Sequence, residues 1–253
     1  MLPKNHFKAA LAAGRNTIGL WNTTPGPVVA ELLAGAGFDW VMIDTEHSPT
    51  DIPDTLGMLQ AMAGYPTSAL VRVASNDAVL IKRVLDLGAQ TIMVPYVQTV
   101  DDARRAVEAM RYPPRGIRGM GGTTRATRYG TVPDYVAQAE TELCLLVQVE
   151  TAATLSRIEA IAAVDGVDGL FIGPNDLSAT MGYPGQVTHP AVVGAIEDAL
   201  RRIDATGKAA GILVLDPGFA RVCMGWGSRV TCVGVDLGML AAATRGLRAE
   251  FAV

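Results

Sequence analysis

Short apolar segments alternate with longer segments of helical pattern along the whole chain, and this alternation constrains the fold more than any other feature. The apolar segments lack the polar–apolar alternation of a half-exposed strand, so we expect parallel strands that are buried on both faces. The predicted strands are Ile18–Leu20, Trp40–Ile43, Ala69–Val73, Thr91–Val94, Leu143–Val149, Gly169–Ile172, Ala209–Val214 and Val230–Val233.

The intervening segments are rich in helix formers, and several begin with a residue suited to a helix N-cap. The predicted helices are Pro25–Ala36, Asp51–Ala63, Asp77–Leu87, Thr99–Met110, Thr151–Ala162, His189–Thr206, Pro217–Trp226 and Leu237–Glu250. Strand–helix units of about 30 residues, repeated over residues 1–253, predict a single-domain α/β protein, a (β/α)8 TIM barrel. An open doubly wound sheet is the alternative, but no G-x-G-x-x-G motif follows the first strand.

Charge and composition exclude several classes of partner. The net charge is −4 and no basic block is present, which argues against nucleic acid and anionic membrane surfaces. The amino terminus lacks the apolar core of a secretory signal, and no apolar run reaches the roughly 20 residues of a membrane span. Three cysteines without metal-ligand spacing argue against a disulfide framework or a zinc site. We therefore expect a soluble, cytoplasmic protein.

Polar residues cluster where the predicted strands end. In a barrel of this kind the active site lies at the carboxyl ends of the strands, so these side chains should converge at one mouth. A long segment, 111–134, with five glycines and five arginines, adds a candidate functional loop. The polar residues at the strand ends are Asp44, Glu46 and His47 after the second strand, Arg72 in the third, Gln148 and Glu150 in the fifth, and Gly173, Pro174, Asn175 and Asp176 after the sixth.

Glu150 and Asp176 lie 26 residues apart, one strand–helix unit, and so at neighbouring strand ends. Two carboxylates there, with other positions left to water and substrate, suit Mg²⁺ or Mn²⁺. The alternative is that each residue caps the helix that follows it.

Arg72 and His47 each allow two interpretations. An arginine in a buried strand requires an anionic partner, which could be Asp44 or Glu46, or the carboxylate or enolate oxygen of a substrate. A histidine beside acidic residues could serve as a general base, or it could be structural.

Lysine is scarce, and its positions matter for the mechanism. An aldolase that forms an imine needs a lysine at the barrel mouth. The four lysines, Lys4, Lys8, Lys82 and Lys208, fall before the first strand, on a helix or before the seventh strand. A metal-assisted reaction is therefore favoured over a covalent imine.

The strand-end motifs resemble those of the HpcH/HpaI aldolase family, class II aldolases that act on 2-oxo acids such as 4-hydroxy-2-oxoheptanedioate. The resemblance covers nearly the whole chain. It rests on AGAGFDWVMIDTEHSP at 34–49, VRVASND at 71–77, LDLGAQTIMVPYVQT at 85–99, YPPRGIRGMGG at 112–122, LLVQVET at 145–151 and GLFIGPNDLSATMGYPG at 169–185.

The resemblance implies a role for each matching residue. It implies a divalent cofactor (Mg²⁺, Mn²⁺ or Co²⁺), a 2-oxo acid donor (pyruvate or hydroxypyruvate) and an aldehyde acceptor. The implied roles are Glu150 and Asp176 as metal ligands, His47 as the base, Asp86 as the carboxylate that raises the basicity of the histidine, Asp44 as the acidic residue before it, Arg72 as the group that stabilises the enolate, Gln148 and Gly173–Asp176 (with Pro174 and Asn175) as the oxo-acid surface, and Arg118 as part of the aldehyde-side wall.

Some points stay open at this stage. Asn175 and Thr45 depart from the residues that many relatives carry, so the acceptor aldehyde does not follow from the resemblance. A phosphoenolpyruvate-type or citramalyl-type lyase, or a non-catalytic 2-oxo acid binding barrel, is the alternative function. The apolar carboxyl-terminal helix is compatible with a homo-oligomer, and the resemblance implies a hexamer in which subunits exchange that helix.

Overall fold

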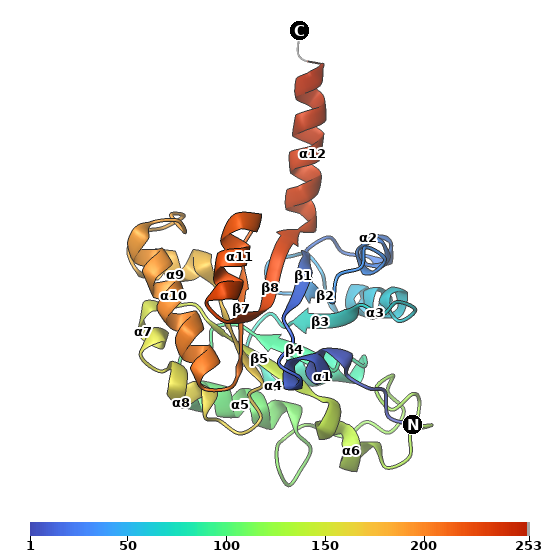
Figure 1. Cartoon of the computed structure of the whole chain (residues 1–253). Helices are drawn as coiled ribbons and strands as arrows, with labels where there is room; N and C mark the ends of the chain where they lie inside the picture. Colours follow the sequence, from blue (N-terminus) through green and yellow to red (C-terminus); the bar gives the residue numbers. More distant parts are fainter. Residues whose placement is uncertain (252–253) are drawn as a thin grey trace.

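The computed structural model, which describes residues 1–251, is a barrel of parallel strands closed by pairing of the first strand with the last. Helices surround the barrel, as Figure 1 shows, and the predicted single-domain (β/α)8 fold is confirmed. The strands are β1 (Thr17–Asn22), β2 (Trp40–Asp44), β3 (Ser68–Arg72), β4 (Thr91–Val94), β5 (Cys144–Val149), β6 (Gly169–Ile172), β7 (Ala209–Leu213) and β8 (Ser228–Val235).

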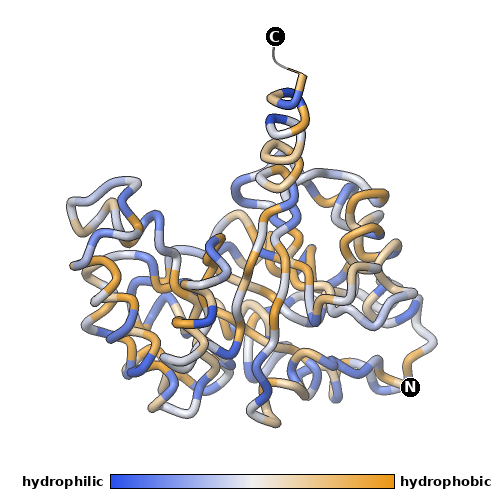
Figure 2. Tube along the Cα trace, turned by 45° about the horizontal axis from the view of Figure 1, so that its top comes forward, coloured by the Kyte–Doolittle hydropathy of each residue, from blue (hydrophilic) through white to orange (hydrophobic). Residues whose placement is uncertain are grey.

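The strands separate two apolar cores, which explains why they lack polar alternation. One core fills the barrel and includes Trp40, Met42 and Phe171, each at most 1% exposed. The other lies between the strands and the helices and includes Val41, Ile43 and Ile172. Successive residues of one strand therefore face different cores, and both are apolar. Figure 2 shows the resulting concentration of hydrophobic residues along the central strands, with hydrophilic residues toward the outer turns.

The predicted helices are present, with ends displaced by a few residues. Proline at the first or second position and capping side chains such as those of Asp51, Asp77 and Thr99 define several helix starts. The helices are α1 (His6–Ala12), α2 (Pro27–Ala34), α3 (Ile52–Met62), α4 (Ala78–Asp86), α5 (Val100–Met110), α6 (Tyr135–Glu142), α7 (Ala152–Leu155), α8 (Ile158–Ala162), α9 (Pro174–Thr180), α10 (Pro190–Ala205), α11 (Pro217–Gly225) and α12 (Asp236–Glu250).

One predicted helix, Thr151–Ala162, is divided into α7 and α8. The helix is interrupted at Ser156 and Arg157. The Ser156 hydroxyl donates to the carbonyl of Ala153, and Arg157 has a non-helical φ of −118°. The Arg157 guanidinium donates to the carbonyl of Gln98, which holds the interruption against the loop before α5.

Helix α1, which the strand pattern did not predict, closes the amino end of the barrel. Phe7 is 2% exposed and meets the ring of Trp40 edge to face, with 6.3 Å between ring centroids. Asn5 caps the helix and donates to Thr91 Oγ1 at the start of β4. The carboxyl ends of the strands therefore provide the open end of the barrel.

Helix α12 begins at that open end and projects away from the barrel (Figure 1). Of its residues only Asp236 is buried, while Leu240 and Leu247 are each 60% exposed. Within residues 1–251, no helix combines the length and the apolar character that crossing a bilayer demands.

Candidate active site

Asp44 and Arg72 form the structural centre of the barrel mouth. They are register partners at the ends of the neighbouring strands β2 and β3. Arg72 Nε donates to Asp44 Oδ1 at 2.9 Å and Arg72 Nη2 donates to Asp44 Oδ2 at 2.7 Å. Both residues are buried, so this two-pronged ion pair satisfies the charge that a buried arginine carries.

Arg72 contacts three further residues and is held in one orientation. Its Nη1 lies 2.7 Å from Glu46 Oε2 and donates to Gln148 Oε1 at 3.4 Å. The guanidinium carbon lies 4.8 Å from the centre of the Trp21 ring, a cation–π contact. Arg72 can therefore be both a partner of Asp44 and Glu46 and a binding group for substrate oxygens, because the ion pairs hold its guanidinium in a fixed place at the mouth.

The pKa values of the two carboxylates beside Arg72 shift in opposite directions. Burial by itself would raise the pKa of Asp44, but the hydrogen bonds and charge of Arg72 outweigh it and lower the value. For Glu46, burial is the largest effect and raises the pKa. The charges of Arg72 and His47 oppose this rise, and the charges of Asp44 and Asp176 add to it. Asp44 is therefore held as an anion that orients Arg72, and its Oδ1 also accepts the backbone N–H of Glu46.

Glu150, at the end of β5, is 3% exposed and held by two hydrogen bonds. The backbone N–H of Tyr96 donates to its Oε1 at 2.6 Å, and Gln148 Nε2 donates to its Oε2 at 3.1 Å. Burial raises the pKa of Glu150 to about 7, and the charges of Glu46 and Asp176 contribute to the rise. Gln148 therefore links the cation of Arg72 to the buried carboxylate of Glu150.

The segment from Gly173 to Asp176 lies against Glu150 after β6. A Cβ on Gly173 would lie 2.7 Å from Glu150 Oε2, so glycine is required for this close approach. Pro174 begins α9, Asn175 is exposed, and Asp176 lies in the first turn of the helix. The residues predicted to form the oxo-acid surface are thus in one place.

The donor set fits a divalent cation held by Glu150 and Asp176. Within residues 1–251, no group of three His, Cys, Asp or Glu side chains has a metal-binding arrangement. Two carboxylates are nevertheless a sufficient protein contribution for Mg²⁺ or Mn²⁺, which retain water and substrate ligands. The Arg72 guanidinium acts on Asp44, Glu46 and Glu150, while the charge of Asp176 raises the pKa of Glu46 and Glu150. The charge of a divalent ion would offset this excess of negative charge.

His47 stands at the outer edge of this cluster, with its side chain 68% exposed. Its Nε2 lies 4.0 Å from Glu46 Oε1, and its backbone N–H points to Asp44 Oδ1. Among the described residues, the carboxylate nearest to the ring is therefore that of Glu46.

Asp86 and Arg118 lie away from the mouth of the barrel. Asp86 is the last residue of α4, five positions before β4, so it lies at the amino end of the barrel. Its Oδ1 accepts from Arg118 Nη2 at 2.8 Å, and the Arg118 guanidinium stacks on the Tyr112 ring. Asp86 and Arg118 therefore do not meet His47 within one chain, because the helices run antiparallel to the strands and carry their carboxyl ends to the opposite face; the roles expected of Asp86 and Arg118 stay predictions.

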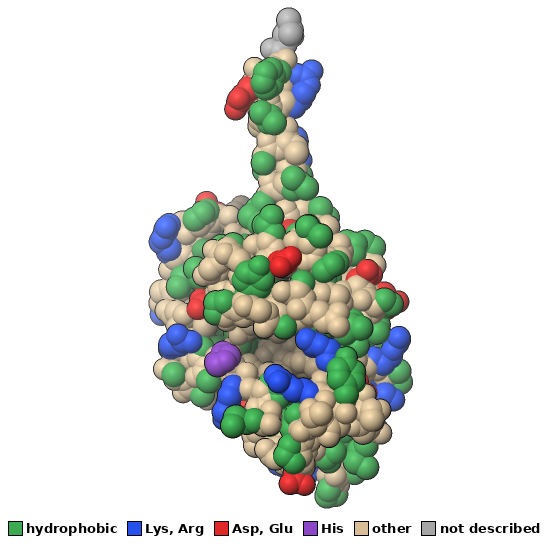
Figure 3. All heavy atoms as spheres, turned by 90° about the vertical axis from the view of Figure 1, so that its right-hand side faces the viewer, with side chains coloured by type: hydrophobic (Ala, Val, Ile, Leu, Met, Phe, Trp, Pro, Cys, Tyr) green, Lys and Arg blue, Asp and Glu red, His purple; other side chains and the backbone are tan. Residues whose placement is uncertain are grey.

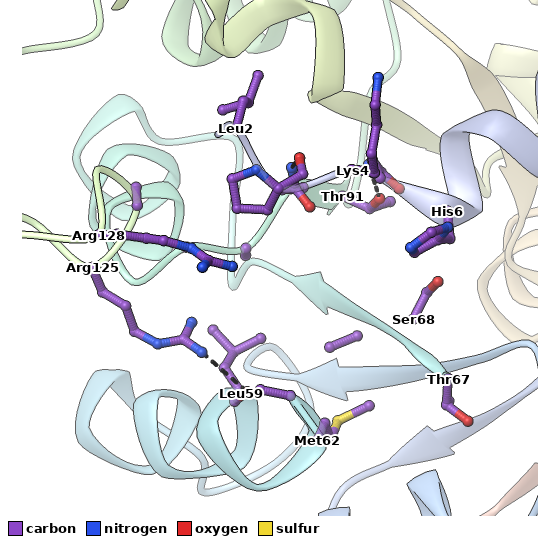
Figure 4. Close-up of a pocket in the computed structure, with 18 of the residues that line it drawn as sticks. Leu2, Lys4, His6, Leu59, Met62, Thr67, Ser68, Thr91, Arg125 and Arg128 are labelled. Atoms are coloured by element: carbon purple, nitrogen blue, oxygen red, sulfur yellow. Dashed lines mark hydrogen bonds between the residues drawn. The ribbon is translucent and has the colours of Figure 1, made fainter. Parts of the chain in front are cut away.

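A cavity of about 610 Å³ also lies at the amino end of the strands. Figure 4 shows the amino-terminal segment and the side chains of Arg125 and Arg128 on opposite sides of it. Arg125 is hydrogen-bonded to the carbonyl oxygens of Leu87 and Leu59. The surface on this side of the molecule is hollowed and bordered by basic side chains (Figure 3). This cavity is remote from the carboxylate cluster, so the chemistry of the mouth is the better guide to the active site.

Two residues at the mouth were not predicted from the sequence. Trp21 lies next to the last residue of β1, and its ring supports Arg72. Tyr96 lies two residues after the end of β4, and its contact with Glu150 is made by the backbone, which no side-chain motif reveals.

Comparison with known proteins identifies the family of the chain. The family model described as HpcH/HpaI aldolase/citrate lyase matches residues 17–243. A solved HpcH/HpaI aldolase/citrate lyase family protein from Burkholderia cenocepacia superposes with a TM-score of 0.94 at 39% identity, covering 98% of this chain and 99% of that one.

Relatives of similar length carry aldolase names. A pyruvate aldolase of Rhizobium etli is 57% identical over 99% of both chains, and a hydroxypyruvate/pyruvate aldolase of Sagittula stellata is 52% identical over 99% of both. A 4-hydroxy-2-oxo-heptane-1,7-dioate aldolase of Salmonella newport is 50% identical over 99% of this chain and 95% of its own. With the family model and these relatives spanning the barrel and its mouth, the chain belongs to the HpcH/HpaI aldolase/citrate lyase family.

Proposed function

We propose that this chain is a metal-dependent class II aldolase that reversibly adds a 2-oxo acid, pyruvate or hydroxypyruvate, to an aldehyde. The aldolase relatives that match its full length make it a carbon–carbon lyase. The observation that carries the proposal is the linked set of Arg72, Gln148 and Glu150 at the mouth, which places a fixed cation beside a carboxylate cluster.

Glu150 and Asp176 would hold the divalent ion, which we expect to be Mg²⁺, Mn²⁺ or Co²⁺. Bound there, the ion supplies Lewis-acid stabilisation of the negative charge that develops on the donor. The backbone N–H of Tyr96 fixes one oxygen of Glu150, and the side-chain amide of Gln148 fixes the other. The carboxylate is therefore oriented before substrate enters.

Arg72 and His47 carry the remaining chemistry. Asp44 holds the Arg72 guanidinium so that it faces the oxo-acid surface formed by Gln148 and Gly173–Asp176, where it stabilises the enolate oxygen. The exposed imidazole of His47 takes the proton from C3 of the donor for addition, or from the C4 hydroxyl for cleavage.

An imine mechanism has no lysine available to it. Lys4, Lys8 and Lys208 bond to groups at the amino end of the barrel, and Lys82 lies on α4. A citrate-lyase type of reaction has weaker support than aldol chemistry, since solved citrate lyases match this chain at 17–19% identity and share the fold alone. The complete set of mouth residues speaks against a non-catalytic barrel.

A role for Asp86 requires a second copy of the chain. Its carboxylate lies at the opposite end of the barrel from His47, and it could raise the basicity of a histidine only in a neighbouring subunit. A homo-oligomer, which the resemblance implies to be a hexamer, would supply that neighbour, and the exposed leucines of α12 offer an apolar surface for assembly. Mixing His47→Ala chains with Asp86→Ala chains should then restore part of the activity that each variant lacks, whereas no recovery on mixing would exclude a shared site.

The function is tested by a panel of aldehydes with pyruvate or hydroxypyruvate as donor. Chelation with EDTA should abolish carbon–carbon bond formation and Mg²⁺, Mn²⁺ or Co²⁺ should restore it. Exchange of the pyruvate methyl protons with solvent reports enolate formation without an acceptor. Full activity after metal stripping would overturn the metal assignment, and the absence of both exchange and product with every donor would overturn the function.

A further inference from the structure

Asp236, the first residue of α12, is buried at 7% exposure and accepts hydrogen bonds from the end of β1 and the segment after it. Its Oδ1 accepts from the backbone N–H of Thr23 at 2.9 Å and from the Thr23 hydroxyl at 2.7 Å. Its Oδ2 accepts from Asn22 Nδ2 at 2.7 Å and from the backbone N–H of Thr24 at 2.8 Å. One side chain therefore fixes three consecutive residues at the carboxyl end of β1.

This set of donors requires an ionised carboxylate. Burial by itself would raise the pKa of Asp236, but the hydrogen bonds from Thr23 and Thr24 outweigh it and lower the value. An ionised carboxylate has only acceptor sites, whereas an amide of the same shape carries an NH₂ donor in place of one oxygen. Because each oxygen of Asp236 accepts from two donors, either orientation of an amide would turn its NH₂ group toward other donors.

These contacts lie where the pairing of β1 with β8 is irregular. The register of the two strands shifts between Gly19 and Trp21, and Trp21 is paired with Val235, the residue before Asp236. An irregularity of this kind disrupts the ladder of hydrogen bonds locally, so regular pairing holds the strand end less firmly. The bonds of Asp236 to Asn22 and the next two residues anchor the strand immediately after Trp21.

Trp21 connects this anchor to the proposed catalytic groups. Trp21 is 3% exposed, and its ring centroid lies 5.7 Å from that of Phe171. The guanidinium carbon of Arg72 lies 4.8 Å from the centre of the Trp21 ring. Arg72 is the cation that we expect to stabilise the enolate, so a displacement of the end of β1 would move the ring on which this cation packs.

We propose that Asp236 is a positioning residue of the active site, which anchors Asn22–Thr24 and thereby sets the place of the Trp21 ring and, through it, of the Arg72 guanidinium. The proposal rests on the aldolase function above. Since Asp236 is also the first residue of α12, the same bonds connect the start of the projecting helix to the geometry of the mouth.

The test is Asp236→Asn, which preserves the shape of the side chain. The assay is the exchange of pyruvate methyl protons with solvent at saturating Mn²⁺, because this reaction needs no acceptor aldehyde. A displacement of about 1 Å far from the chemistry can cost about 10²-fold, so we expect kcat/KM for exchange to fall about 10–100-fold. Mn²⁺ affinity should equal the wild-type value, because the bonds of Asp236 go to the end of β1 and not to Glu150 or Asp176.

A double-mutant cycle with Trp21→Leu distinguishes positioning from a general loss of stability. If Asp236 acts through the Trp21 ring, Asp236→Asn should lower exchange by no more than about twofold once the ring is gone, the usual error of additivity. A merely structural role would give the same fold loss in both backgrounds. Thr23→Val is a milder variant for use if the doubly substituted chain does not fold. It removes only the hydroxyl that donates to Asp236 Oδ1, so exchange should fall by a smaller factor than in Asp236→Asn.

Asp216→Asn is the matched control. Asp216 precedes α11 as Asp236 begins α12, but it is exposed and accepts from the backbone N–H of Phe219 within its own helix. The same chemical change there should leave proton exchange at the wild-type rate.

The outcomes separate this inference from the function itself. Wild-type exchange in Asp236→Asn, or an equal loss with and without Trp21, would overturn the role of Asp236 and leave the aldolase intact. Wild-type exchange in Thr23→Val would likewise count against the anchor. A wild-type protein without exchange or aldol product would overturn the proposed function.

Discussion

Gly173→Ala tests the metal site without removing any of its ligands. Gly173 has an ordinary φ of −97°, so alanine introduces no backbone strain. The added Cβ would lie 2.7 Å from Glu150 Oε2 and 2.8 Å from Glu150 Cβ. Non-bonded carbon atoms prefer about 3.5–4.0 Å, so Glu150 and Gly173 must separate by roughly 0.7–1.2 Å.

The displacement sets the expected magnitude. Misplacement of a reacting group by about 1 Å can cost about 10²-fold in rate, so we expect kcat to fall by about that factor. We expect Mn²⁺ affinity to fall at least about 10-fold, in line with the loss of orienting contacts at metal sites. The overpacking should also cost about 1–3 kcal/mol of unfolding free energy, which leaves a large domain folded.

Calorimetric titration with Mn²⁺ and a coupled pyruvate-release assay measure these effects. Gly194→Ala is the control, because Gly194 lies on α10 and an added Cβ there would meet no atom within 4 Å. This variant should match the wild type in both assays. Wild-type Mn²⁺ affinity and turnover in Gly173→Ala would refute the reasoning, because Glu150 would then not need its observed position.

Three other substitutions test the proton-transfer group, the buried ion pair and the closed end of the barrel. His47→Ala should lower kcat by about 10²–10⁴-fold while leaving Mn²⁺ affinity intact, and unchanged turnover would remove His47 from proton transfer. Asp44→Asn should lower the free energy of unfolding by about 3–5 kcal/mol at pH 7, because it leaves Arg72 buried without its closest anion. The folded-state pKa of Asp44 lies below its ordinary value of 3.8, so its stabilising contribution is present above that value and is lost as the pH falls through the lower folded-state pKa. The deficit of Asp44→Asn in urea unfolding should therefore shrink below about pH 4, and a constant deficit down to about pH 2 would contradict the assignment. Phe7→Ala should cost about 3–5 kcal/mol, since Phe7 closes the barrel core, and a loss below about 1 kcal/mol would show that α1 does not stabilise the barrel.

Local pattern was enough to predict most of the secondary structure. Strands buried on both faces have no polar alternation, and capping residues such as Asp77 and Thr99 define the helix starts. The pattern failed where a local contact overrides helix propensity, as at Arg157, and where short helices have little pattern, as in α1 and α6. Their burial depends on partners distant in sequence, such as Trp40 for Phe7.

The sequence by itself determined the strand–helix order and the identity of the polar residues at the strand ends, because both depend on neighbours within a few positions. Only the closed barrel decided which of those residues meet. Strand register pairs Asp44 with Arg72, the left-handed turn at Tyr96 brings a backbone amide to Glu150, and antiparallel packing of α4 carries Asp86 to the far end. These are distances between residues tens of positions apart, fixed by strand register and helix direction, and no local pattern encodes them.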